Sequence, residues 1–118
     1  MNLEQEIKRY SKMNGYLIAT YEPINCACGG KEFNLHSDDT EGGAYAVCLE
    51  CKAEHDLENS RQYIEEAIFN ICHCDNDRFE IGVGKAYYDD STDTQWVYVG
   101  ASCKACELEG VYVDWQVR

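Results

Sequence analysis

Eight cysteines stand out in this sequence, and their spacing occurs twice. Each copy has a Cys-x-Cys pair and then a Cys-x-x-Cys pair, separated by 19 residues in the first copy and by 28 in the second. Four thiolates are the ligand set of a closed, tetrahedral structural zinc site, so the sequence predicts one such site in each copy. The predicted ligands are Cys26, Cys28, Cys48 and Cys51 for site 1, and Cys72, Cys74, Cys103 and Cys106 for site 2.

The identity of the metal and the grouping of the cysteines into sites each have an alternative. All-sulfur tetrahedral ligation also suits iron, although the spacing favours zinc. The repeat favours ligation within each copy, and the alternative is a cross-braced arrangement in which Cys26 and Cys28 join the second copy. The N-terminus lacks the pattern of a signal peptide, so we expect a cytoplasmic protein, in which paired cysteines indicate metal rather than disulfides.

Closed four-thiolate sites argue against chemistry at the metals. A hydrolytic zinc needs an open coordination position, and His-Glu-x-x-His is absent from the sequence. A redox Cys-x-x-Cys would need a thioredoxin-like βαβ context, which is also missing. We expect the three histidines, His36, His55 and His73, to be surface groups or groups that support the ligands.

The cysteine pairs need hairpins to bring them together, and the pattern around them predicts strands. Apolar residues alternate in both copies. When the first copy is shifted by 46 residues, its Phe33 and Leu35 align with Phe79 and Ile81 of the second copy. Helical spacing of apolar residues appears in two other places. The expected elements are helices over 2–13 and 59–70, a strand over 16–21, hairpin strands over 32–36 and 44–47, and strands over 79–83, 96–101 and 111–115.

These elements predict a small metal-bound α+β fold. Two tandem β-hairpin modules of the zinc-ribbon kind follow an N-terminal helix, and a linking helix joins them. A module of about 45 residues is near the size at which metal help is needed for stability. The predicted boundaries are 1–22 for the N-terminal helix and strand, 23–58 for the first module, 59–71 for the linking helix and 72–118 for the second module.

The chain is strongly acidic, with 22 acidic and 10 basic residues and a net charge of −12. Each zinc with four thiolates carries −2, so two sites bring the net charge to about −16. The acidic residues are spread along the whole sequence without a basic block, which disfavours direct contact with nucleic acid. No apolar stretch approaches the roughly 18 residues of a membrane span, so no membrane association is expected.

The second copy is rich in aromatic residues. Simple alternation places Trp96, Tyr98 and Tyr112 on the faces opposite Val97, Val99 and Val111, so both faces of this sheet are apolar. One face could pack on the other copy or on the N-terminal helix. The alternative is an exposed aromatic patch with an acidic rim, which is typical of a protein-binding surface. The candidate protein-binding residues are Trp96, Tyr98, Tyr112 and Asp114.

Two stretches also carry a resemblance. One is Cys26-x-Cys28-Gly-Gly-x-x-Phe33 with Cys48-x-x-Cys51, and the other is Trp-Val-Tyr-Val-Gly at 96–100 with Cys103-x-x-Cys106 and Tyr-Val-Asp-Trp at 112–115. Together they resemble small, uncharacterised bacterial proteins with tandem zinc-ribbon-like halves. The resemblance implies a bacterial cytosolic protein with two structural zinc ions and transfers no catalytic residue.

The sequence therefore favours a non-enzymatic, acidic protein-binding module with structural zinc. Its expected partner is a basic protein, such as a nuclease, a toxin or another nucleic-acid enzyme, because opposite charges speed association. One alternative is an enzyme whose site lies between the two modules and uses acidic residues with His36 or His73. A further alternative is a zinc-ribbon protein associated with nucleic acid.

Overall fold

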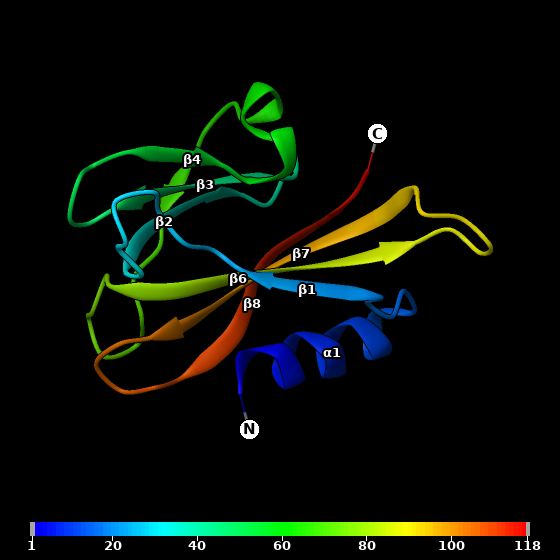
Figure 1. The fold of residues 1–118 in the computed structure, drawn as a ribbon, viewed down its shortest axis with the longest axis horizontal. Coiled ribbons are helices and arrows are strands. Elements are labelled where there is room, and N and C mark those ends of the chain that lie inside the picture. The colour runs from blue at the N-terminus through cyan, green and yellow to red at the C-terminus, as the bar shows by residue number, and fades with distance from the viewer. Residues whose placement is uncertain (1, 118) are drawn as a thin grey trace.

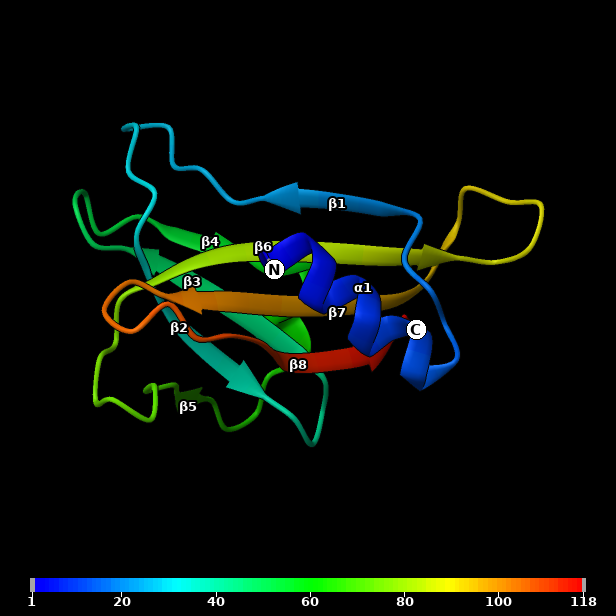
Figure 2. The same cartoon turned by 90° about the horizontal axis from the view of Figure 1, so that it is seen from below.

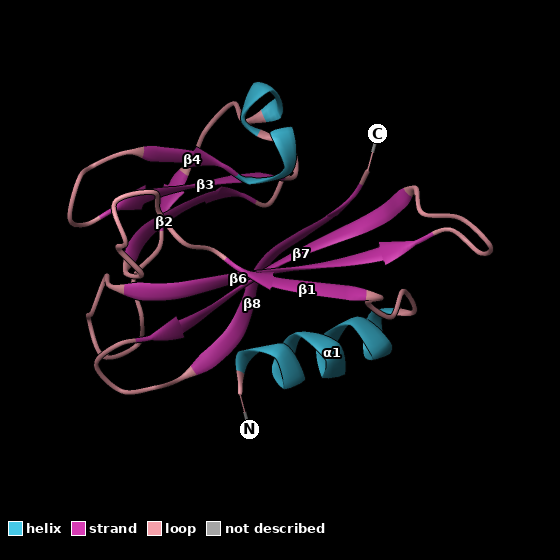
Figure 3. Cartoon of the chain, in the orientation of Figure 1, coloured by secondary structure: helices cyan, strands magenta, loops and turns pink. Residues whose placement is uncertain are grey.

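Helix α1 (Leu3–Asn14) begins the fold, and the strands that follow form one antiparallel sheet. The computed structural model describes residues 2–117, coloured by secondary structure in Figure 3. The strand order is β4-β3-β2-β6-β7-β8, with β1 beside β6 and β5 beside β2. The strands are β1 (Thr20–Pro23), β2 (Phe33–Asp38), β3 (Gly43–Cys48), β4 (Glu54–Asp56), β5 (Ile68–Phe69), β6 (Phe79–Tyr87), β7 (Thr94–Cys103) and β8 (Glu109–Gln116).

The sheet folds over itself between β2 and β6, which pair only through Phe33 and Phe79. As a result, β2, β3 and β4 lie above one face of the layer made by β1, β6, β7 and β8, and α1 lies beneath the other (Figures 1 and 2). Two cores follow from this arrangement. The larger core joins side chains of both cysteine copies, and the smaller one lies between α1 and the sheet.

The predicted N-terminal helix is confirmed, with both ends defined by capping. Asn2 and Gln5 form a reciprocal capping box at the start, and Gly15 ends the helix in a left-handed conformation with φ of 91°. Leu3 and Ile7 are buried against the sheet. The helix approaches closely because Gly84 and Gly100 present no side chain to Ile7.

The first strand begins later than the β-forming residues at 16–21 suggest. The backbone N–H of Tyr16 donates to Ser11 O, and that of Ile18 donates to Ser11 Oγ. These bonds hold the segment after the helix against its last turn, so pairing with β6 starts only at Thr20.

The predicted linking helix over 59–70 is wrong. This segment forms two 3₁₀ turns, η1 (Leu57–Asn59) and η2 (Arg61–Tyr63), and then the short strand β5. Its backbone donors bond to groups distant in sequence. The N–H groups of Glu65 and Glu66 donate to the carboxylate of Asp38, and that of Asn70 donates to Leu35 O. Because these donors are taken, the helical bonds cannot form.

Strands of both cysteine copies lie in the one sheet, and β1 from the N-terminal segment pairs with β6 of the second copy. The division into modules at 23–58 and 72–118 stays a prediction. Within residues 2–117, no helix has the length and apolar character to cross a membrane.

Candidate metal centres

The four cysteines of each copy lie together at the end of the molecule where β2 and β6 begin and β3 and β7 end. In site 1, Sγ of Cys26 lies 3.4 Å from Sγ of Cys51, and Sγ of Cys28 lies 3.6 Å from Sγ of Cys48. A tetrahedral zinc with bonds of about 2.3 Å holds its sulfurs about 3.8 Å apart, so this cluster fits a metal ion closely.

Site 2 has the same geometry. The Sγ atoms of Cys72 and Cys106 are 3.5 Å apart, as are those of Cys74 and Cys103. In both sites the four sulfurs lie within 4.8 Å of one another, so the cysteines group within each copy rather than across the copies. The first and third cysteines of each site are buried and the other two are exposed.

The turn at each Cys-x-Cys pair has the same backbone in both copies. The N–H of Gly29 donates to Cys26 O, and the N–H of Asp75 donates to Cys72 O. Gly29 and Asp75 both have a left-handed backbone, with φ of 90° and 70°. Glycine adopts this conformation at no steric cost, and Asp is among the residues that tolerate it. The shift of 46 residues found in the sequence therefore relates two equivalent turns.

The Cys-x-x-Cys turns are equivalent too. Lys52 donates its N–H to Cys48 O, and Glu107 donates to Cys103 O. Their φ values are 66° and 64°. Both turns point backbone N–H groups at a buried sulfur, which favours a thiolate over a thiol.

That preference is visible in two thiols. The backbone N–H of Cys51 is the largest influence on Cys48 and lowers its pKa to about 7. Burial raises the pKa of Cys103, but the backbone N–H of Cys106 and the side-chain amide of Asn76 help to bring that pKa down to about 6. Each site thus has one buried sulfur prepared for the charged form that binds metal.

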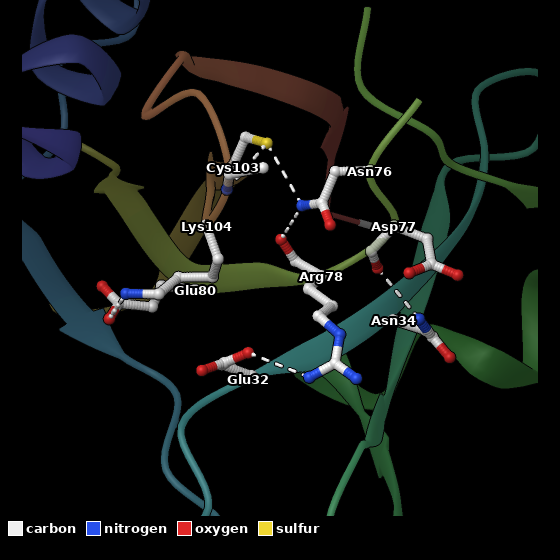
Figure 4. Close-up of polar contacts among 9 residues, drawn as sticks. Glu32, Asn34, Asn76, Asp77, Arg78, Glu80, Cys103 and Lys104 are labelled. Carbon is white, nitrogen blue, oxygen red and sulfur yellow. Dashed lines mark hydrogen bonds and ion pairs between the residues drawn. The ribbon is translucent and has the colours of Figure 1, made fainter. Parts of the chain in front are cut away.

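The two sites differ at one equivalent position. In site 2, Nδ2 of Asn76 donates to Sγ of Cys103 at 3.2 Å, as Figure 4 shows. Site 1 has Gly30 there, and a Cβ at Gly30 would lie 2.8 Å from Sγ of Cys48. Asn76 is not among the residues predicted from the sequence, although its place two residues after Cys74, where the first copy has Gly30, is the available signal.

A row of paired residues connects the sites across four strands. Cys48 pairs with Phe33, Phe33 with Phe79, and Phe79 with Cys103. At a strand spacing of about 4.8 Å, three steps along the row keep the two buried cysteines within roughly 15 Å of each other. The two metal sites are therefore near neighbours.

Polar contacts accompany this row (Figure 4). Nη1 of Arg78 lies 3.6 Å from Oε1 of Glu32, and these two residues occupy equivalent positions in the two copies. Nδ2 of Asn34 donates to Asp77 O at 2.9 Å. Beside site 2, Nζ of Lys104 lies 2.7 Å from Oε1 of Glu80.

Three of the candidate protein-binding residues, Trp96, Tyr98 and Asp114, hold α1 and the segment after it on the sheet. Tyr98 is fully buried, and its hydroxyl donates to Tyr16 O at 2.8 Å. Trp96 stacks on Tyr16 with ring centroids 4.7 Å apart, and its Nε1 donates to Asp114 at 2.8 Å. A partner cannot reach Tyr98 in this fold, so including it in an exposed patch is wrong.

Tyr112 lies on the other face of the sheet because the register shifts between β7 and β8. Val99 pairs with Val113 and Gly100 with Val111, which leaves Tyr112 in a bulge. Its ring packs against Phe79 in the larger core, at 5.3 Å. The predicted common face of Tyr112 and Trp96 is therefore wrong. A role in partner binding for Trp96, Tyr112 and Asp114 stays a prediction.

The structure does not bring the histidines together with acidic residues in a cleft between the copies. Side chains of both copies fill that space. The ring of His36 stacks on that of Tyr45, with centroids 4.5 Å apart, and its centroid lies 5.1 Å from that of Phe69. His73 is exposed beside site 2. The filled core counts against an active site at this position.

Comparison with known proteins identifies no relative of this chain. A scan with protein-family models found no match, and searches of curated proteins and of solved structures found none either. The resemblance to bacterial tandem zinc-ribbon proteins stays a prediction.

Proposed function

We propose that this chain is a non-enzymatic, acidic protein-binding module in which two zinc ions stabilise two zinc-ribbon-like hairpins. The sulfur geometry supports the structural part of the proposal. Four sulfurs in each site surround a position suited to one ion and leave no place for a substrate. The hairpins β2–β3 and β6–β7 carry the cysteine pairs at their open ends, which supports the zinc-ribbon part of the proposal.

Metal analysis tests the structural part. Purified protein should contain about two zinc ions per chain, and removal of zinc by a chelator should unfold it, because structural zinc contributes directly to folding. Circular dichroism melts before and after chelation measure the effect, and zinc added back should restore the transition. Free thiols together with an unchanged melting transition would contradict the proposal. Absorption bands typical of iron–thiolate sites would show that the bound metal is iron rather than zinc.

The charge distribution carries the proposal of a basic partner. The net charge is −12, or about −16 with two zinc ions bound. Within residues 2–117, five ion pairs engage five of the nine basic residues, and most of the acidic side chains are outside these pairs. Such a surface attracts basic proteins and repels nucleic acid. A nuclease, a toxin or another nucleic-acid enzyme has the required charge.

Partner capture at two ionic strengths tests this part. The zinc-loaded protein on a resin should retain basic proteins from a bacterial lysate at low salt and release most of them at high salt, because salt screens exposed charges. Mass spectrometry identifies what is retained, and a resin carrying an unrelated protein of similar net charge is the control. Capture that does not respond to salt would contradict the electrostatic basis.

A further inference from the structure

Strand β5 presents an open, apolar edge on the surface. It pairs with β2 through His36 and Ser37, and no other described strand lies on its far side. Three side chains in this short stretch are well exposed, with exposed fractions of 59% for Ile68, 40% for Phe69 and 53% for Ile71. Open strand edges pair readily with another chain, and apolar side chains beside them add to the contact.

A groove of about 560 Å³ adjoins this edge, and carboxylates line it. Asp39, Glu41, Glu65 and Glu66 are exposed around the groove, with Ile68 at the β5 edge. None of these four carboxylates takes part in an ion pair with another residue of 2–117. The groove therefore combines uncompensated negative charge with an apolar strand.

The shape of the groove is maintained from within by Asp38, which is only 5% exposed. Its Oδ1 accepts the backbone N–H groups of Thr40 and Glu41, and its Oδ2 accepts those of Glu65 and Glu66. These four bonds hold the 40–41 and 65–66 segments, which form two walls of the groove. Because the bonds come from backbone N–H groups, the carboxylates of Glu41, Glu65 and Glu66 remain available to a partner.

We propose that an extended segment of a basic protein binds along β5 and adds a strand to this edge. Its backbone pairs with β5, its Lys or Arg side chains enter the carboxylate groove beside Ile68, and its apolar side chains on the opposite face cover Phe69 and Ile71. Strand addition of this kind takes affinity from backbone hydrogen bonds and specificity from alternate side chains. The inference rests on the proposed function and assigns the surface that performs it.

The negative charge of the groove favours a basic extended segment over a second copy of the chain, nucleic acid or an anionic lipid surface. A second copy of the chain would bring its own net charge of −12 to a groove that is already negative. Nucleic acid and anionic lipid surfaces are repelled for the same reason. Lys and Arg side chains compensate the carboxylates, and an extended segment matches the open strand edge.

Two synthetic peptides test the proposal on the zinc-loaded, full-length protein. One alternates Lys with Val, and its counterpart has Glu in place of Lys. The Lys peptide should bind saturably and change the NMR amide signals of residues 65–71, and binding should weaken with salt. The Glu peptide should not bind. Equal binding of both peptides, or signal changes confined to other surfaces, would overturn this site.

Variants separate the groove from net charge. The double substitution Glu65→Gln and Glu66→Gln should weaken binding of the Lys peptide about fivefold at low salt. The matched control, Asp89→Asn with Asp90→Asn, makes the same charge change in the exposed β6–β7 turn and should leave affinity within about twofold. Ile68→Ser should weaken binding without altering the melt. Equal effects of the two double variants would overturn the proposal.

The outcomes also distinguish this site from the proposed function. Failure of the Lys peptide to act at β5, together with salt-sensitive capture of basic proteins, overturns only the site. Failure of both peptide binding and capture overturns the protein-binding function as well.

Discussion

At the scale of single residues, the two metal sites have the same backbone but different surroundings. Asn76 donates a hydrogen bond to Cys103, whereas Gly30 at the equivalent position has no side chain to offer. Hydrogen bonds to a ligating thiolate stabilise its charge and orient it. Site 2 should therefore hold its metal more firmly than site 1.

Substitution of Asn76 measures this difference. Asn76→Ala should weaken metal binding at site 2 by about 10- to 100-fold, the range for lost groups that support a ligand, and change binding at site 1 much less. Competition with a chromophoric chelator resolves the two affinities. Gly30→Ala is the reciprocal test and should weaken site 1, because its Cβ would lie 2.8 Å from Sγ of Cys48. Equal affinities in Asn76→Ala and the unaltered protein would contradict the assignment.

Asp38 is the other residue with a distinct role, since four backbone N–H groups surround its carboxylate. The N–H of Glu41 is the largest of the influences that lower its pKa, followed by the N–H of Glu65. A lowered pKa in the folded state means that the carboxylate stabilises the fold in its charged form. The contribution is complete above the unfolded pKa of about 3.9 and is lost as the pH falls through the lower folded value.

Asp38→Asn should accordingly reduce the melting temperature at pH 7. The difference in melting temperature between the variant and the unaltered protein should persist down to about pH 5. It should narrow only as the pH approaches the folded pKa of Asp38. Melts of the zinc-loaded proteins over this range provide the measurement. The adjacent Asp39 is the control, because partial desolvation of its carboxyl group and the nearby Asp114 raise its pKa, so Asp39→Asn should not destabilise the fold. A difference in melting temperature that has disappeared when the pH is lowered to 6 would contradict this role of Asp38.

At the scale of elements, the position of α1 depends on glycines in the sheet against which it packs. A Cβ at Gly100 would lie 2.6 Å from Cδ1 of Ile7 and 3.1 Å from Cδ1 of Leu3. Both side chains are buried and have little room to move. The helix and the sheet are thus fitted to each other at this contact.

Gly100→Ala should destabilise the protein by about 1–3 kcal/mol, the usual cost of overpacking a core. Chemical denaturation of the zinc-loaded protein measures the change in the free energy of unfolding. Gly110→Ala on the adjacent strand β8 is the matched control, because a Cβ at this position would have no atom within 4 Å and no comparable loss is expected. A similar loss in both variants would point to strand flexibility rather than to the helix contact.

The elements also show which features are predictable from sequence. Helix α1 and the pairing of β2 with β3 follow from local periodicity and capping, and the structure has both. The segment after Asn59 has helical periodicity too, but Asp38 and Leu35 take its backbone donors. The bulge at Tyr112 reverses an alternation that the sequence alone presents as regular. Both departures come from partners distant in sequence, which local patterns do not contain.

The metal sites were more accessible to sequence reasoning than the surfaces. Cysteine spacing restricts which sulfurs can meet, and the structure groups them within each copy. Trp96 and Tyr98 gave no such restriction, because the same alternation suits a covered face and an exposed one. The contacts of α1 decide between these cases at Tyr98.

At the scale of the whole molecule, the two metal sites share one packed core. The row from Cys48 through Phe33 and Phe79 to Cys103 ties the ligands of each site to the other half. Loss of either metal should loosen the packing that holds the other.

Single ligand substitutions test this coupling. Cys28→Ser in site 1 and the equivalent Cys74→Ser in site 2 should each reduce the zinc content to about one ion per chain. The remaining ion should also bind more weakly than in the unaltered protein, because the shared core is less well ordered. Elemental analysis and chelator competition measure the two effects. Full affinity at the intact site would mean that the halves are independent.

The antiparallel pairing of Phe33 with Phe79 bears on how the chain arose. Residues at equivalent positions meet there, as they do in the self-complementary interface of a two-fold homodimer. Two separate copies of one hairpin would form this contact only at sufficient concentration, whereas a single duplicated chain makes it intramolecular. In a single chain the two copies also need not be identical. The second copy has the longer hairpin and the covering helix, whereas the strand β5 beside the first copy has an open edge.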